Sequence, residues 1–299
     1  MNRALKKPGN KGKIMILIDY NGIAIGTIVM EKLEVDENLI RHVILNRIRG
    51  FRKRFKDKYG EVVIVADGKK NWRYDVFPEY KAKRKSNRKE SSIDWNEVFR
   101  ITNTIYDELG EYFHYRTMKH ERCEADDIIA ALTENTQEFG NYEPVMIISA
   151  DKDFAQLQKY DNVAQFSPMT KKFIKEEHPR KQLLELILKG DQADGVPNVL
   201  SPDDVFISEG RQTPLRQKRM EEIIADLDDG ELLYAAEWYR NYLRNKKMID
   251  LSETPQDLKK EIINNFESQG NPRPDSMKIM NYLMEKRCRN LLEDLGDFV

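Results

Sequence analysis

Short apolar runs alternate along the chain with longer stretches whose apolar positions recur at helical spacing. Residues 14–18, 62–66 and 144–149 are rich in Ile and Val, which is typical of buried parallel strands. Because helical stretches separate these runs, the pattern predicts an α/β fold with a central, mainly parallel sheet flanked by helices. The predicted helices in this part of the chain cover residues 36–58, 95–109 and 125–139.

The pattern changes after residue 178. Two weaker apolar runs before it, residues 112–117 and 163–167, predict a fourth and a fifth strand. Beyond it only helical periodicity is visible, over residues 183–188, 215–227, 231–244, 255–266 and 276–295. We therefore expect three parts, which are a disordered basic arm over 1–13, an α/β domain over 14–178 and a C-terminal all-helical region over 179–299.

Composition narrows the class of protein. The 299 residues are 40% apolar and 34% charged, and the net charge is −1, so contact with nucleic acid has to come from local basic patches. Cys123 and Cys288 indicate neither a disulfide framework nor a zinc site. No apolar run is long enough for a signal peptide core or a membrane span, so we expect a protein that does not bind membranes. We also expect a monomer.

Acidic residues follow each of the three strong strands. Asp19 ends the first run, Asp67 follows the second, and Asp151 and Asp153 follow the third. The carboxyl ends of parallel strands meet at one edge of a sheet, where ligands of open α/β sheets bind. We therefore expect these four carboxylates to converge at that edge.

Three more acidic residues, Glu124, Asp126 and Asp127, open the predicted helix 125–139. The helix can begin at the same edge, which would bring these carboxylates to the others. Taken alone, each acidic group is more often structural, because Asp and Glu favour the first turn of a helix and Asp is common in turns. The functional interpretation depends on their convergence.

The electrostatic cost of convergence favours a metal site. Two like charges about 4 Å apart repel by about 4 kcal/mol at an effective dielectric constant of 20, so six or seven carboxylates need cations or have to take up protons. Oxygen ligands without His or Cys favour Mg²⁺, with Mn²⁺ as a substitute, over zinc. Two such ions roughly 3.5–4 Å apart are the usual clamp for phosphodiester hydrolysis.

A basic and aromatic segment follows Asp67 directly. Residues 69–89 hold nine Lys and Arg against two acidic residues. This mixture suits single-stranded nucleic acid, because basic groups neutralise phosphates and rings stack on bases. The alternative is a solvated charge run or a localisation signal. We favour binding, with stacking by the rings Trp72, Phe77 and Tyr80.

A further pair of acidic residues, Asp191 and Asp194, lies in the glycine-punctuated segment GDQADGVP. The pair is a weak signal by itself, because Asp and Gly are ordinary turn residues. The order of motifs is more specific: strand-Asp19, strand-Asp67-Gly68, FPEYKAKRK, CEADD, SADKDFAQL and GDQADGVPNV. In this order they resemble the flap endonuclease or 5′-nuclease family over residues 14–199. The SPMTKK segment and the length are similar to the replication ribonuclease H of T-even-type bacteriophages.

The resemblance implies roles for these residues. It implies a basic helical arch over about residues 69–91, in which Lys81 and Arg84 meet the scissile phosphate and Tyr80 lies beside the entering strand, with Lys83, Lys85 and Arg88 as further nucleic-acid contacts. Lys81, Arg84, Asp126 and Asp151 would be the catalytic residues. The acidic residues would hold two Mg²⁺ ions, with the first on Asp19, Asp67, Glu124 and Asp126, and the second on Asp151, Asp153 and Asp194, with Asp191 acting through water and Asp127 supporting the metal set.

The expected function is a Mg²⁺-dependent 5′-to-3′ exonuclease or flap endonuclease with ribonuclease H activity, which removes RNA primers and adjacent DNA or 5′ flaps during replication. Its substrates would be RNA–DNA hybrids and flap or nicked duplex DNA, in the host cytoplasm if a phage encodes it. A single-strand-binding protein or a sliding clamp could dock on residues 295–299, although this tail could equally pack on its own helix.

Two alternatives use the same motifs. One is a catalytically inactive, structure-specific DNA-binding protein of the same fold, which is disfavoured because no acidic position is lost. The other is a phosphotransferase of the haloacid dehalogenase or receiver type, whose nucleophile loop and chain length do not match.

One feature of the 5′-nuclease family, its Gly-Ile-Gly hairpin, is absent, because Val199 runs into Leu-Ser-Pro-Asp-Asp-Val-Phe. This departure leaves open a potassium site and the usual grip on duplex.

Overall fold

Six strands form one sheet in the order β3-β2-β1-β4-β5-β6. The computed structural model describes residues 15–82, 84, 88, 90–208, 210–229, 236–270 and 273–299. Four strand pairs are parallel, and β6 at the edge pairs antiparallel with β5, so the predicted mainly parallel α/β sheet is confirmed. The strands are β1 (Met15–Asp19), β2 (Glu61–Ala66), β3 (Arg116–Lys119), β4 (Val145–Ile148), β5 (Val163–Ser167) and β6 (Lys172–Ile174).

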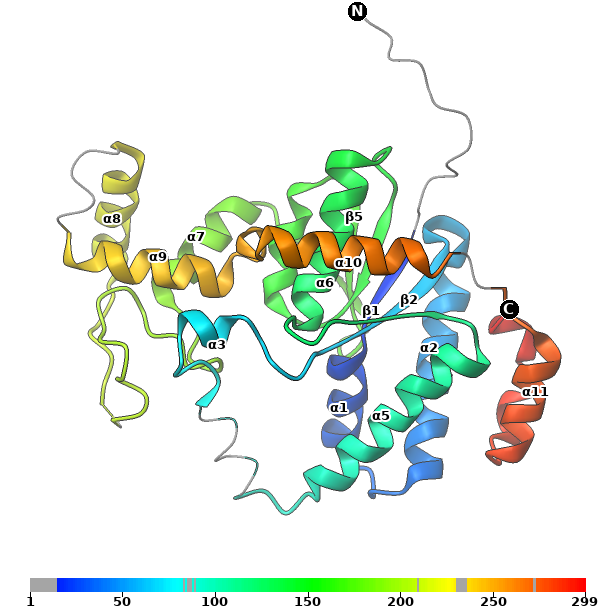
Figure 1. Ribbon diagram of the computed structural model, residues 1–299. Helices are drawn as coiled ribbons and strands as arrows, with labels where there is room; N and C mark the ends of the chain where they lie inside the picture. The colour runs from blue at the N-terminus through cyan, green and yellow to red at the C-terminus, as the bar shows by residue number, and fades with distance from the viewer. Residues whose placement is uncertain are drawn as a thin grey trace, which may run out of the picture.

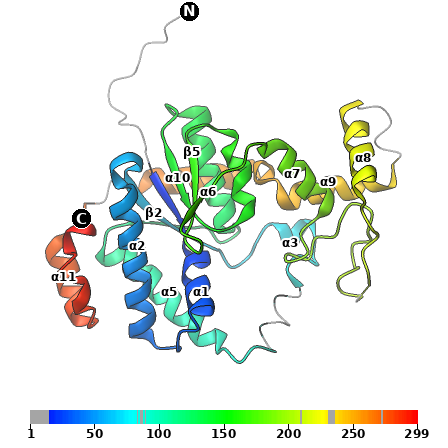
Figure 2. The same ribbon diagram turned by 180° about the vertical axis from the view of Figure 1, so that it is seen from behind.

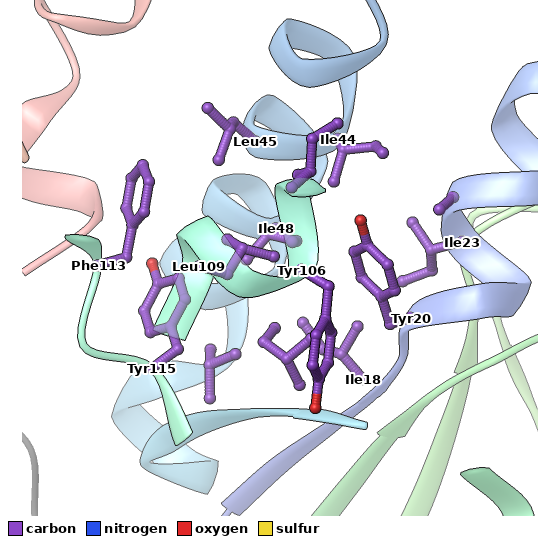
Figure 3. Packing of buried hydrophobic residues seen from close by; sticks show 14 of the residues in the cluster. Ile18, Tyr20, Ile23, Ile44, Leu45, Ile48, Tyr106, Leu109, Phe113 and Tyr115 are labelled. Atoms are coloured by element: carbon purple, nitrogen blue, oxygen red, sulfur yellow. The ribbon is translucent and has the colours of Figure 1, made fainter. Parts of the chain in front are cut away.

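Helices cover both faces of this sheet (Figures 1 and 2). The strands alternate their side chains between the faces, so Ile16 and Ile18 of β1 join one apolar cluster and Leu17 joins the other. Figure 3 shows the first cluster, where Tyr20, Ile44 and Tyr106 meet from three helices. The first face carries α1 (Tyr20–Met30), α2 (Glu37–Tyr59), α5 (Trp95–Tyr112) and α11 (Ser276–Glu285), and the second carries α6 (Ala125–Glu134) and α10 (Gln256–Ser268).

The predicted strand over residues 112–117 is wrong in its position. Tyr112 is the last residue of α5, and the strand begins only at Arg116. The rings of Tyr112 and Phe113 pack against Tyr282 of α11, with centroids 4.7 and 5.2 Å apart. This contact with a distant helix, invisible in the local pattern, holds the apolar residues outside the sheet.

The C-terminal part begins with α7 (Pro179–Lys189), α8 (Gln217–Asp229) and α9 (Glu237–Ile249), which extend to one side of the sheet (Figure 1). The helices α10 and α11 then return to opposite faces of the sheet. The first five residues of the predicted helix 231–244 and the predicted arm 1–13 lie outside the described residues. Among the helices of the described chain, none is long and apolar enough to cross a membrane.

The predicted helix over 276–295 ends early, at Glu285. Arg287 has a φ of 57°, which an α-helix cannot accommodate, and two short 3₁₀ turns follow at Arg289–Leu291 and Leu295–Asp297. The C-terminal tail packs on the protein itself. Phe298 is fully buried with its ring 5.1 Å from that of Phe113, and Arg52 donates to the carbonyl of Val299 at 2.7 Å.

Candidate active site

Local structure fixes the carboxylates at the ends of β1 and β2. Asp19 starts α1, with one oxygen accepting from the Gly22 amide at 2.9 Å and the other from the Ser149 hydroxyl at 2.9 Å. A Cβ at Gly22 would lie 2.3 Å from an Asp19 oxygen, so any larger residue there would displace this carboxylate. Asp67 accepts from the Ala125 amide at 2.9 Å, which joins the end of β2 to the start of α6.

The acidic residues after β4 are also held by backbone contacts. Asp151 accepts from the Asp153 amide at 2.9 Å and so caps the short 3₁₀ helix Lys152–Lys159 that follows β4. Asp191 accepts from the Ala193 amide at 2.8 Å and pairs with Lys152 at 3.0 Å. The GDQADGVP turn therefore lies against the segment that follows β4.

Eight acidic side chains border two cavities at this edge of the sheet. The larger cavity, of about 390 Å³, also reaches Lys81, Arg84 and Arg88. The smaller one is lined by Glu124, Asp126, Asp153, Asp191 and Asp194. The carboxylates at the larger cavity are Asp19, Asp67, Glu124, Asp126, Asp151 and Asp194.

Three side chains of the basic segment lie against two of these carboxylates. The Lys81 ammonium contacts Glu124 and lies 3.4 Å from Asp194, and Arg84 also contacts Asp194. The Tyr80 hydroxyl lies 2.8 Å from a Glu124 oxygen and 3.0 Å from an Asp194 oxygen. Within the described part of the chain, no three acidic, His or Cys side chains are gathered as an ion's ligand shell.

Three other carboxylates, Asp19, Asp126 and Asp153, form no ion pair among the described residues, and the pKa of each is raised. Burial raises the pKa of Asp19 to about 7, with further contributions from Asp67 and Asp151. Burial and the neighbouring Asp151 raise the pKa of Asp153 to about 7 and that of Asp126 well above its usual value. Glu124 is different, since Lys81 and Arg73 outweigh its burial and lower its pKa.

These observations fit a hard divalent cation. All the donors are carboxylate oxygens, which Mg²⁺ and Mn²⁺ prefer. One oxygen of Asp153 is buried without a hydrogen-bond partner among the described residues. The raised pKa values of Asp19, Asp126 and Asp153 show that the ionised carboxylates lack compensating positive charge. Cations bound here would supply that charge.

Asp127 lines neither cavity, and its contacts are those of a residue that supports the acidic cluster rather than of a direct ion ligand. It is fully buried, and both of its oxygens already accept hydrogen bonds from protein donors. Thr254 donates to one oxygen at 2.8 Å, and Arg73 donates to the other at 2.9 Å. Asp127 also accepts from the Glu124 amide at 3.0 Å. It therefore supports the neighbouring Glu124 from within the core.

The prediction that Trp72, Phe77 and Tyr80 stack on bases is wrong. All three rings are at least 96% buried. Trp72 lies in the apolar cluster on the face of the sheet that α6 and α10 cover, and Phe77 and Tyr80 pack towards α7 and α9. Arg88 lines the larger cavity, whereas Lys83, Lys85 and part of the predicted arch lie outside the described residues. Sequence reasoning missed Trp95 and Phe99, which border the site from α5, because aromatic residues on an amphipathic helix usually indicate core.

The carboxylates at the strand ends and the basic segment above them define a nuclease of the 5′-nuclease class. The chain belongs to the 5′-3′ exonuclease family. Residues 25–184 match the family described as 5′-3′ exonuclease, N-terminal resolvase-like domain, and residues 178–298 match the family described as T4 RNase H, C terminal. The resemblance predicted from the motifs is confirmed.

Individual relatives agree with this assignment. The chain is 33% identical over 293 residues to ribonuclease H of Enterobacteria phage T4, covering 94% of this chain and 95% of the relative. It is 31% identical over 145 residues to a 5′-3′ exonuclease of Buchnera aphidicola subsp. Schizaphis graminum, covering 46% and 47%. In fold it is similar to T5 5′-exonuclease with bound zinc ions, with a TM-score of 0.62 and 16% identity, covering 85% and 99%.

Proposed function

We propose that this protein is a divalent-metal-dependent 5′ nuclease that cleaves RNA–DNA hybrids and flap or nicked duplex DNA. The observation that carries this function is the convergence of eight acidic residues from separate elements on adjoining cavities, beside Lys81 and Arg84. The relative from phage T4 is a ribonuclease H, which favours RNA–DNA hybrids among the substrates. Removal of RNA primers and adjacent DNA during replication is the corresponding role.

Two groups of carboxylates would hold the ions. One site would be formed where β1 and β2 end and α6 begins. Its ligands would be Asp19, Asp67, Glu124 and Asp126. Asp151, Asp153 and Asp194 would form the second, with Asp191 acting through water. When bound, two Mg²⁺ ions would neutralise charge on the scissile phosphate and lower the pKa of an attacking water molecule. Asp127 contributes by holding the start of α6, where Glu124 lies.

Lys81 and Arg84 would bind the scissile phosphate. Both side chains lie at the cavity that the carboxylates border, and both now neutralise carboxylates of the proposed ion sites. When cations take over those carboxylates, the ammonium and guanidinium groups are available for the phosphate, whose charge increases in the transition state. Arg88, at the same cavity, would bind a neighbouring phosphate.

The experiment that tests this function compares two 5′-labelled substrates, a flap DNA and an RNA–DNA hybrid, with and without Mg²⁺. We expect short products from the 5′ end of both substrates in Mg²⁺ and none in EDTA. The rival function, a catalytically inactive DNA-binding protein of the same fold, predicts binding of the flap without products under either condition. Products in EDTA would contradict the metal dependence.

A further inference from the structure

A third cavity, of about 650 Å³, adjoins the acidic edge of the sheet. It shares Asp67, Lys81, Arg84 and Glu124 with the site described above. Its far wall is formed by the start of α5 and the turn after β2, which contribute Trp95, Phe99 and Asn71. The volume lies within the range of roughly 300–1,000 Å³ that pockets for small organic ligands occupy. We call it the side cavity.

Aromatic rings form much of this wall. Trp95 and Phe99 are partly exposed, with centroids 5.9 Å apart and planes inclined by 33°. The Arg88 guanidinium lies over both rings, 5.0 Å from the Phe99 centroid and 5.8 Å from that of Trp95. Tyr74, which is 44% exposed, also lines the cavity. The rings available to a ligand are therefore these, rather than the buried Trp72, Phe77 and Tyr80.

We propose that the side cavity binds an unpaired nucleotide of the strand that the enzyme degrades, with the base against Phe99 and Trp95. This inference rests on the proposed function, because it assigns a subsite to the same substrate. A base has flat faces that stack on aromatic rings, and the partly exposed rings of Trp95 and Phe99 offer such faces at the cavity. Arg84 and Arg88 at the same cavity suit the flanking phosphates.

Fluorescence of 2-aminopurine tests the subsite directly. The base analogue is placed at the first unpaired position of a 5′ flap and, in a second substrate, at the 5′ end of a nick without a flap, with Ca²⁺ in place of Mg²⁺ to hold the substrate uncut. We expect wild-type protein to quench the flap probe by stacking. Phe99→Leu should relieve the quenching and weaken flap binding by about five- to thirtyfold more than nick binding.

The matched control is Phe139→Leu, which should behave as wild type. Phe139 is 82% exposed and follows the C-terminal end of α6, whereas Glu124 lies at the N-terminal end of that helix. Phe99 is absent from the buried core clusters, so Leu is expected to be tolerated, and the melting temperature checks this. Absence of quenching by wild type, or equal losses on flap and nick, would overturn the subsite. Wild type that cleaves neither substrate in Mg²⁺ would instead contradict the proposed function.

Discussion

At the scale of single residues, Lys81 and Arg84 neutralise part of the negative charge of the site. The Lys81 ammonium is bound to Glu124 and near Asp194, and Arg84 shares Asp194 with it. These two side chains supply positive charge directly beside the carboxylates. The same side chains are the ones that the motif order assigns to the scissile phosphate, so each would exchange a carboxylate for a phosphate during the reaction cycle.

Lys81→Ala tests this exchange. We expect the cleavage rate of bound substrate to fall by about 100-fold or more, with a much smaller change in affinity, because the phosphate contact strengthens in the transition state. Single-turnover kinetics and binding in Ca²⁺ separate the two effects. Lys70→Ala is the matched control, since Lys70 is 80% exposed and pairs only weakly with Glu121. A similar small effect in both variants would make Lys81 an ordinary surface charge.

The raised pKa values of Asp19 and Asp153, both about 7, predict how stability depends on pH. These carboxyls hold their protons more tightly when folded than when unfolded, so the free energy of unfolding falls as pH rises from about 4 to 7, by up to about 4 kcal/mol for each group. Mg²⁺ bound to these carboxylates would offset this loss. We therefore expect Mg²⁺ to raise the melting temperature more at pH 8 than at pH 5.5. Equal shifts at both pH values would argue against ion binding by these groups.

At the scale of elements, the alternation of apolar runs predicted the parallel sheet because buried strands bear an uninterrupted apolar signal. The segment 163–167 is predicted to the residue, since β5 has this extent. The errors occur where distant packing decides. Tyr112 and Phe113 resemble the start of a strand locally, yet contact with Tyr282 places them at the end of α5. Distant packing also fixes Asp127, since one of its oxygens accepts from Thr254, which no local pattern could indicate.

The C-terminal tail belongs to the fold at this scale. Phe298 is fully buried against Phe113, so Phe298→Ala should cost about 3–5 kcal/mol and lower the melting temperature by roughly 10 °C. Thermal unfolding measures the change, with Met277→Ala as the control because Met277 is 62% exposed on α11. If the tail were instead a docking peptide for a replication partner, the substitution would abolish partner binding and leave the melting temperature unchanged.

At the scale of the whole molecule, the chain is almost neutral but its charge is unevenly distributed. Residues 69–89 carry nine basic and two acidic residues and begin two positions after Asp67 at the metal edge. Of these residues, Lys81, Arg84 and Arg88 line the cavity that the carboxylates border, so we expect this part of the surface to attract a nucleic-acid strand. For these three residues the sequence predicted the placement, because charge and strand order are both local signals.

The position of the basic segment predicts a requirement for a free 5′ end. If a single strand has to pass the segment to reach the carboxylates, streptavidin on a 5′-biotinylated flap should lower the cleavage rate at least tenfold when it is added before the enzyme. Streptavidin on the 3′ end of the same substrate is the control and should have little effect. Equal rates on open and blocked 5′ ends would show that the strand does not enter from its end.

The most direct test of the whole account is cleavage of a 5′-labelled flap by Asp126→Asn in Mg²⁺, measured beside its binding in Ca²⁺. Asp126 lines both acidic cavities, and Asn keeps its shape while removing the charge that would hold an ion. We predict that cleavage falls by at least a thousandfold, while flap affinity stays equal or increases because one repulsion of phosphate is gone. Cleavage within threefold of wild type would contradict the assignment of this edge as the catalytic centre.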